Sequence, residues 1–365
     1  MGTQSQQDWL RLHLTQGVGR VGIIKLIEAF GDANTALNAS QQDWKHYAGL
    51  KSLRIGSPPS VESKKFITAW EKLTKRQAKI VSLWDEHYPS QLRTIHDPPA
   101  LLYLCGDLTN KTAIAIVGSR KASAEGKRLA NETAATLSSY AVTVVSGLAR
   151  GIDTAAHSGA VIGQGSTIAV LGGGIDKIYP PENHALFEQI QTHGAIITEY
   201  PPGTEPLPGH FPARNRIISG LSHGVFIAEA TLNSGSLITA DFALEQGRDV
   251  YAAPGSVYNP YCQGNLQLLK QGALLVTEAE DILHYCHIET YPHHIKPPPS
   301  YDQSKLSLEQ NKVFDLLNAT PRHLDTLAQE SGLTAMEVSA IVLHLELEGL
   351  ASSQPGGRYI RGSAA

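Results

Sequence analysis

The stretch TAIAIVGSRKASAEGKR, residues 112–128, decides the fold of the largest part of this 365-residue chain. It begins with a continuously apolar, β-branched run, passes through a Gly-Ser-Arg turn and continues as a polar segment of helical length. A continuously apolar run of this kind is typical of a strand in a parallel sheet, because both faces of such a sheet are covered. We therefore predict a buried strand over 112–118 that leads into a helix.

Six further apolar runs repeat this pattern, each followed by a turn and most by a helix-length segment. They are AVTVVSG (141–147), STIAVLGG (166–173), AIITEY (195–200), GVFIAEA (224–230), DVYAAPG (249–255) and ALLVT (273–277). Alternating strands and helices favour right-handed crossovers and parallel pairing. The expected fold class is α/β, with a Rossmann-like, doubly wound and mostly parallel sheet over 95–286 that binds ligands at the carboxyl ends of its strands.

The segments on either side of the predicted sheet have different sequence patterns. Apolar residues recur three and four apart in WLRLHLTQGVGRVGIIKLIEAFG (9–31) and FITAWEKLTKRQAKIVSLW (66–84), so residues 1–90 are predicted to be helical, without strands. HDPPALLYLCGD (96–107) is expected to be an extended link with one edge strand. Residues 287–304 form a Pro-rich linker, and 305–362 follow the outline of a winged helix, with three helices and a hairpin.

Composition narrows the classes of function. The formal net charge is −4, whereas proteins that coat nucleic acid are usually basic, so any DNA contact is expected to be local. Cys105, Cys262 and Cys286 form no CxxC pair, and the linker histidines have no partners at ligand spacing, so no metal and no cofactor are expected. The polar start and the lack of a long apolar run predict a cytoplasmic protein without a membrane partner.

Three Gly-rich loops follow predicted strands and suit anions. The first has Gly118, Ser119 and Arg120 before Ser123, a good helix cap, and exposed amides at a helix start favour phosphate. The second has Gly147, Arg150 and a possible cap at Asp153, and the third has three glycines before Lys177. Neither GxGxxG nor GxxxxGK[ST] occurs, which argues against NAD and against an ATPase. Each loop alone is also explained by tight chain reversal.

Two later loops complete the candidate site. The fourth loop brings Phe211, Arg214, Asn215 and Arg216 together; bases of a single strand stack on rings while guanidiniums pair with phosphates, although a core ring with surface ion pairs is the plainer alternative. The fifth loop carries short donors at a helix start, which simple capping would also explain. They are Asn233, Ser234, Gly235, Ser236 and Thr239.

Catalysis has weaker support. A nucleophilic Ser146 or Ser236 would need His157 or Glu199 as a base, and neither serine lies in a GxSxG elbow. Glu199 and Glu229 end strands, where paired carboxylates perform proton transfer, and this alternative stays open.

Taken in order, the motifs VGSR, SGLARGID, LGGGID, PARNRIISG, NSGSLITADFALEQGRDVYAAPG and QGNLQLLKQGA resemble the DNA-processing protein A (DprA, also called Smf) family over residues 95–285. The resemblance implies a Rossmann-like domain that binds single-stranded DNA without sequence preference, dimerises, and helps to load RecA recombinase during natural transformation. It implies no catalytic activity. By position, its DNA pocket falls on the residues of the five loops named above.

The flanks resemble parts of some family members. Residues around GVG (17–19) are similar to a helix-hairpin-helix or sterile-alpha-motif-like unit. Arg20 and Lys25 nearby suggest an auxiliary DNA role, although helix packing alone would explain the glycines. The expected recognition helix of the winged helix, residues 334–349, has Glu337, Glu346 and Glu348 but no Lys or Arg, so we assign it to protein contact or packing, with DNA second. The alternative function is a nucleoside monophosphate phosphoribohydrolase-like enzyme, whose PGGxGT motif is reduced here to PGGR (355–358).

Overall fold

The computed structural model describes residues 3–50, 55–108, 111–288, 306–318 and 320–362. The chain divides into two compact units, residues 1–290 and 291–365, and each is described by itself. The Pro-rich linker predicted over 287–304 lies almost entirely outside the described residues.

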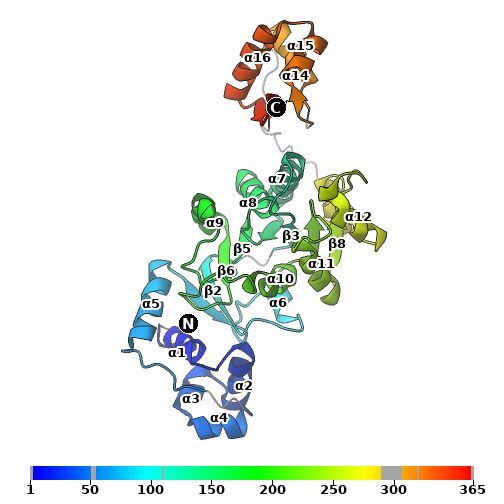
Figure 1. Ribbon diagram of the computed structural model, residues 1–365. Helices are drawn as coiled ribbons and strands as arrows, with labels where there is room; N and C mark the ends of the chain where they lie inside the picture. The colour runs from blue at the N-terminus through cyan, green and yellow to red at the C-terminus, as the bar shows by residue number, and fades with distance from the viewer. Residues whose placement is uncertain (1–2, 51–54, 109–110, 289–305, 319, 363–365) are drawn as a thin grey trace. The chain divides into compact units, whose positions relative to one another are not determined.

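A nine-stranded sheet forms the centre of the first unit, in the order β1-β2-β6-β5-β4-β3-β7-β8-β9 (Figure 1). The strands are β1 Lys79–Ser82, β2 Leu101–Gly106, β3 Ala113–Val117, β4 Thr143–Ser146, β5 Thr167–Val170, β6 Ala195–Thr198, β7 Gly224–Ile227, β8 Asp249–Ala252 and β9 Leu274–Leu275. The seven strands β6, β5, β4, β3, β7, β8 and β9 pair in parallel with their neighbours in this order. Strand β2 pairs antiparallel with both β1 and β6. The predicted doubly wound, mostly parallel α/β fold is confirmed, and all seven predicted strands are present.

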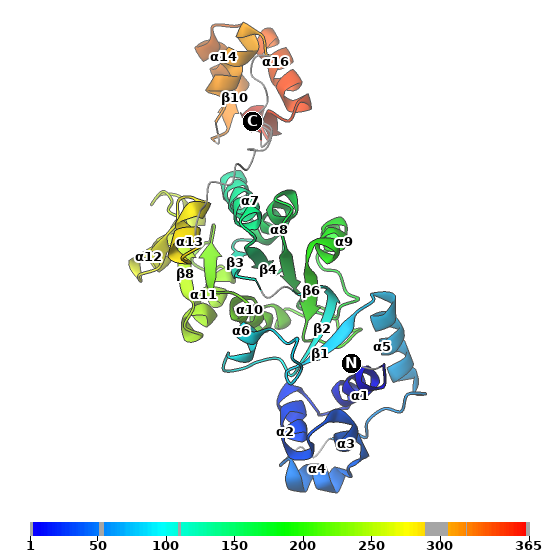
Figure 2. The same cartoon turned by 180° about the vertical axis from the view of Figure 1, so that it is seen from behind.

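Helices cover both faces of this sheet (Figure 2). They are α7 Ala124–Ser139, α8 Ile152–Ile162, α9 His184–His193, α10 His210–Gly220, α11 Ser236–Glu245, α12 Gln263–Lys270 and α13 Ala279–Tyr285, with 3-10 turns η1 Pro181–Asn183 and η2 Pro260–Cys262. Alternate residues of β3 serve opposite faces, because side chains alternate along a strand. Ile114 and Ile116 pack with α7 and α8, whereas Ala115 and Val117 pack with α10 and α11.

The chain reverses its direction of winding beside β3. From β3 it steps outward through β4, β5 and β6, and then returns to place β7 on the other side of β3. Val117 and Ile227 are partners at the carboxyl ends of these two strands. A crevice forms outside the strand ends at such a switch point, which makes this the expected ligand position.

The prediction of an entirely helical segment over 1–90 is wrong at its end. The helices are α1 Thr3–Leu14, α2 Arg20–Phe30, α3 Ala33–Asn38, α4 Gln41–Tyr47 and α5 Lys64–Lys75, with α6 Ser90–Arg93 in the link that follows. Residues 79–82 continue as strand β1, which covers β2, so β2 is not an edge strand. A four-residue run is too short for its apolar period to separate strand from helix, and pairing with β2 decides the outcome.

The N-terminal helices share a hydrophobic core with the sheet. Leu26 and Trp44 belong to the same buried cluster as Tyr103 of β2 and Phe187 of α9. His13 adds a hydrogen bond between its Nδ1 and the Tyr103 hydroxyl at 2.9 Å. The helical segment is therefore packed onto the sheet through a continuous apolar interior.

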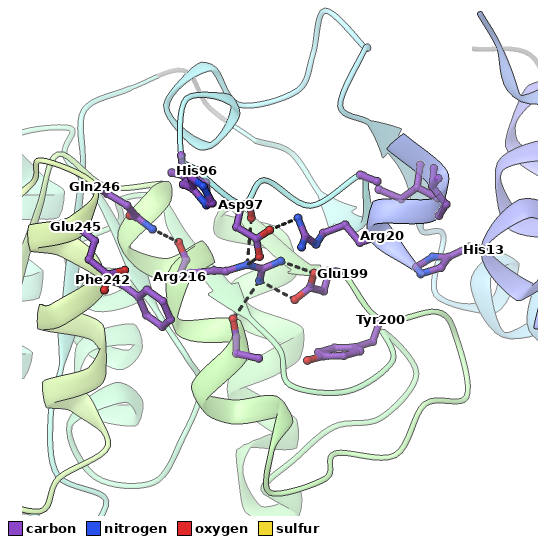
Figure 3. Close-up of a pocket in the computed structure, with 15 residues that line it drawn as sticks. His13, Arg20, His96, Asp97, Glu199, Tyr200, Arg216, Phe242, Glu245 and Gln246 are labelled. Atoms are coloured by element: carbon purple, nitrogen blue, oxygen red, sulfur yellow. Dashed lines mark hydrogen bonds and ion pairs between the residues drawn. The ribbon is translucent and has the colours of Figure 1, made fainter. Parts of the chain in front are cut away.

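An ion-pair network around the buried Arg216 reinforces this junction (Figure 3). Arg216 of α10 donates from Nη1 and Nη2 to both oxygens of Glu199, at 2.7 and 2.6 Å, and from Nε to Asp97 Oδ2 at 3.1 Å. Asp97 also pairs with Arg20 at the start of α2. These four residues line a cavity of about 870 Å³, together with apolar residues such as Ile23 and with Phe242.

The second unit is a winged helix, as predicted. Its elements are α14 Leu308–Leu316, β10 Arg322–His323, α15 Leu324–Ser331, α16 Ala335–Leu347, β11 Ala351–Gln354 and β12 Arg358–Arg361. The strands form a small sheet in the order β10-β12-β11. Phe314, Leu327, Val338 and Leu345 fill its core.

We expect Arg216→Met to lower the free energy of unfolding of the first unit by about 2 to 4 kcal/mol, because Glu199, whose side chain is only 14% exposed, would lose its partner. The double variant Glu199→Leu/Arg216→Met should recover much of this loss, since it leaves no unpaired charge. Urea denaturation, monitored by tryptophan fluorescence, measures the change. All four tryptophans lie within residues 9–84, so the signal reports on the first unit.

Arg128→Met is the matched control. Arg128 pairs with Glu132 on the exposed surface of α7, with side chains 41% and 57% exposed, so its loss should cost under about 1 kcal/mol. Equal losses for the two single variants would contradict the structural role of Arg216.

Candidate nucleic-acid interface

A cavity of about 690 Å³ opens at the switch point between β3 and β7. Its lining includes ten of the residues that the sequence singled out, drawn from the first, fourth and fifth loops. They are Gly118, Ser119, Arg120, Phe211, Arg214, Asn215, Ser234, Gly235, Ser236 and Thr239. Segments that lie about 100 residues apart in sequence thus meet in one hollow.

The loop after β3 is held in place by Glu229, which lies just beyond β7. The Ser119 amide donates to the Glu229 carbonyl at 2.7 Å, and the Ser123 amide donates to Glu229 Oε1 at 2.8 Å. The Ser123 hydroxyl also donates to Glu229 and accepts from the Gly126 amide at 3.0 Å, which caps α7 as predicted. At Gly118, a Cβ would come within 2.6 Å of the Glu229 carbonyl oxygen, so only glycine fits.

Arg120 and Phe211 form one wall of the cavity. The exposed guanidinium of Arg120 lies 5.0 Å from the centre of the Phe211 ring, in a cation–π arrangement. Tyr179 also lies near Phe211, with the two ring centres 5.6 Å apart. An exposed cation beside an aromatic ring can pair with a phosphate while a base contacts a ring face.

Arg214 forms the floor and is 3% exposed. Its Nη1 donates to the Gly147 carbonyl at 2.8 Å and to the Val170 carbonyl, and its Nε donates to Asn215 Oδ1 at 3.2 Å. Burial lowers the pKa of Arg214 to about 10, while the carboxylate of Asp153 opposes the shift. The guanidinium therefore stays charged at neutral pH and makes the floor positive.

The loop after β4 differs from the prediction. Asp153 is not the cap of α8; Gly151 precedes the helix with φ of +79°, and Asp153 lies in the first turn. Its carboxylate turns back and accepts from the amides of Gly147 at 3.1 Å and Ala149 at 3.3 Å. Burial raises the pKa of Asp153, and nearby Arg214 acts in the opposite direction. These two amides are thus already bonded within the protein.

Hydroxyl groups gather at the start of α11. The hydroxyls of Ser234 and Ser236 lie 2.7 Å apart, and Asn215 donates from Nδ2 to the Gly235 carbonyl at 3.3 Å. Gly235 precedes the helix without a side-chain cap, and Thr239 lies one turn further along. Short donors beside a positive helix end suit an anionic oxygen.

Five predicted residues do not line this cavity. Gly147 lies beneath it, where a Cβ would collide with the Arg214 guanidinium. Arg150 is exposed and pairs with Glu182, Lys177 pairs with Glu205 at 2.6 Å, and Asn233 is exposed. Arg216 lines the cavity of about 870 Å³ and not the one that contains Arg214, because residues two apart on a helix point in widely different directions.

The sequence analysis missed several lining residues, above all Lys121, Tyr179 and Tyr261. Both tyrosines lie next to prolines, in IYPPEN and VYNPYC, and 40% and 42% of their surfaces are exposed. Aromatic residues beside prolines in loops at strand ends were the sequence signal that could have identified these two tyrosines. The loop of Tyr261 also carries Tyr258, which is 92% exposed.

The residues considered for catalysis are engaged elsewhere. His157 is buried with its Nδ1 2.8 Å from the Thr167 hydroxyl, and burial lowers its pKa to about 3. The Ser146 hydroxyl donates to the Ile116 carbonyl at 2.6 Å. Glu199 holds Arg216, and Glu229 holds the loop after β3. Within the described residues, no group of three His, Cys, Asp or Glu side chains is arranged to hold a metal.

No helix in the described part of the chain combines the length and apolarity needed to cross a bilayer.

Comparison with known proteins assigns both units. Residues 79–287 match the family model of DNA recombination-mediator protein A, and residues 296–357 match that of the DprA winged helix domain. Protein Smf of Escherichia coli K12 is 41% identical over 284 residues, which cover 76% of this chain and 75% of that protein.

Two solved structures are similar. DNA processing protein A of Streptococcus pneumoniae has 38% identity and a TM-score of 0.62, covering 73% of this chain and 93% of the other. The Helicobacter pylori protein, solved to explain its single-stranded DNA binding mode, has 29% identity and a TM-score of 0.52, covering 58% of this chain and 96% of the other. The chain belongs to the DNA-processing protein A (DprA/Smf) family.

Proposed function

We propose that the cavity at the switch point binds single-stranded DNA without sequence preference. One observation carries the proposal: an exposed arginine lies over an aromatic ring, above a buried arginine, in a hollow flanked by helix starts. This combination serves any nucleotide, because phosphates are alike and every base has a face that can stack.

The backbone of the strand would meet three kinds of group. Arg120 and Lys121 supply exposed cations, Arg214 supplies a fixed positive floor, and the start of α11 supplies hydroxyls and amides. Bases would stack on Phe211, with Tyr179 and Tyr261 as further platforms. Contacts of this kind position a strand but do not read its sequence. The proposed site also includes four residues that lie outside the lining of the cavity. They are Gly147, Arg150, Lys177 and Asn233.

We further propose that the protein works in the cytoplasm as a homodimer and helps to load RecA onto incoming single-stranded DNA during natural transformation. The family supports this role. The sheet ends at the short edge strand β9, where Leu275 is 48% exposed, and a dimer formed through the Rossmann-like domain would extend the DNA track. The cavity is assigned to binding and not to catalysis, since both carboxylates considered beside it are engaged: that of Asp153 accepts from backbone amides, and that of Glu229 holds the first loop.

Arg120→Ala should weaken binding of a labelled oligothymidylate by about tenfold to a hundredfold, the value of a charge-assisted hydrogen bond. The slope of log affinity against log salt should shrink by about 0.7 to 1, because one phosphate contact is lost. Fluorescence anisotropy at several salt concentrations measures both. Arg128→Ala, on the exposed surface of α7, is the control and should match the parent. An unchanged affinity for Arg120→Ala would rule out the cavity.

Phe211→Leu should also weaken binding, by about 1 to 3 kcal/mol, because a stacking platform is lost. Its salt slope should stay near the parent value, since no cation is removed, which distinguishes it from Arg120→Ala. Phe242→Leu is the matched control, because Phe242 lines the other cavity. Equal affinities for Phe211→Leu and Phe242→Leu would show that Phe211 does not stack a base.

RecA loading can be tested on single-stranded DNA that is first covered by a single-strand-binding protein. The parent should accelerate RecA filament formation, measured by RecA ATP hydrolysis, and Arg120→Ala should not. Acceleration by both proteins would show that RecA loading does not depend on the cavity.

Incubation of the protein with a panel of nucleotides should release no base, and release of a base would favour the hydrolase alternative.

A further inference from the structure

Helix α16 of the winged helix carries apolar side chains on two opposite faces. Val338, Val342 and Leu345 point inward and are fully buried. On the outer face, Met336, Leu343 and Leu347 are 81%, 57% and 79% exposed. A helix that is apolar on both sides is normally covered on both sides, because exposed apolar surface is unfavourable in water.

The outer residues are spaced for contact with another helix. Met336, Ala340, Leu343 and Leu347 follow one another at intervals of four, three and four residues. At about 100° per residue they fall within one narrow face, and the alternation of four and three is that of a coiled-coil seam. An extended strand or a flat surface would not match this spacing.

Acidic residues flank this outer seam. Glu337 and Glu348 lie on one side and Glu346 on the other, and α16 contains no Lys or Arg. The described part of the unit has seven carboxylates against four Lys and Arg residues. Nucleic acid would be repelled by such a face. A second copy paired antiparallel through it would bring Glu337 near Glu348, a like-charge contact that opposes self-association.

We propose that the outer face of α16, defined by Met336, Ala340, Leu343 and Leu347, docks an amphipathic helix of a partner protein. The partner helix has apolar residues at the same alternating spacing and Lys or Arg beside them. Its seam would cover the exposed leucines, and its cations would face Glu337, Glu346 and Glu348. This surface goes beyond DNA binding and would tie a protein partner to the DNA-bound chain.

Two synthetic helical peptides test the proposal on the full chain. Both have leucine at the seam positions, and the flanking positions carry lysine in one and glutamate in the other. We expect the lysine peptide to bind, with an affinity that falls as salt rises, and the glutamate peptide not to bind. Leu343→Ser/Leu347→Ser should weaken binding of the lysine peptide by about tenfold or more, because two apolar side chains that the peptide would cover are lost.

Leu308→Ser is the matched control, since Leu308 is 81% exposed on α14. Glu348→Lys should weaken binding severalfold, and Asp315→Lys, an exposed position on α14, should not. All of these sites are on the surface, so circular dichroism should show unchanged thermal unfolding. Oligothymidylate binding should be the same for all variants, which keeps this test separate from the DNA cavity.

Three results would overturn the proposal. The first is equal binding of the two peptides, or no binding of the lysine peptide to the parent. The second is an undiminished affinity of Leu343→Ser/Leu347→Ser. The third is a dimer, seen by light scattering, that disappears in this double variant, because the occupant would then be a second copy.

Discussion

The candidate site depends on the burial of one positive charge. The Arg214 guanidinium joins the carbonyls of Gly147 and Val170, and thereby fastens together the ends of β4 and β5. A buried cation needs hydrogen-bond acceptors and a compensating charge: here two backbone carbonyls and Asn215 accept from the guanidinium, and the Asp153 carboxylate acts on it electrostatically. The floor of the cavity keeps its charge because these partners are fixed parts of the protein. Residue 147 must be glycine for the same reason, because a Cβ there would collide with the Arg214 guanidinium.

The other cations near the strand ends show how an acidic molecule can hold a local positive site. Arg150, Lys177 and Arg216 are each matched by a carboxylate. Arg120 has no ion-pair partner among the described residues and rests on a ring. Pairing with an aromatic face leaves the outer side of a guanidinium free for an incoming anion. The division between structural and available charge therefore follows the partners of each residue and not the net charge of the chain.

Much of the fold could be predicted because its strands are continuously apolar. Runs such as TAIAIVG are long enough to leave one interpretation, whereas KIVS in β1 is stabilised by pairing that no local pattern reveals. The loops of the site were identified from their glycines and cations. The sequence could not predict which of the cations faces the cavity, because it does not fix the rotation of α10 about its axis. This rotation separates Arg214 from Arg216. Asp153 was misread since a carboxylate can bond either its own helix or the preceding loop.

The continuous interior shared by the N-terminal helices and the sheet limits how this protein can be rearranged. Tyr103 and Phe187 are covered on one side by residues from before position 75. A graft of the sheet domain without its helical neighbour would therefore expose part of this apolar interior, including aromatic surface, to solvent. The first segment is therefore not an independent cassette, whereas the C-terminal unit has a separate core of its own.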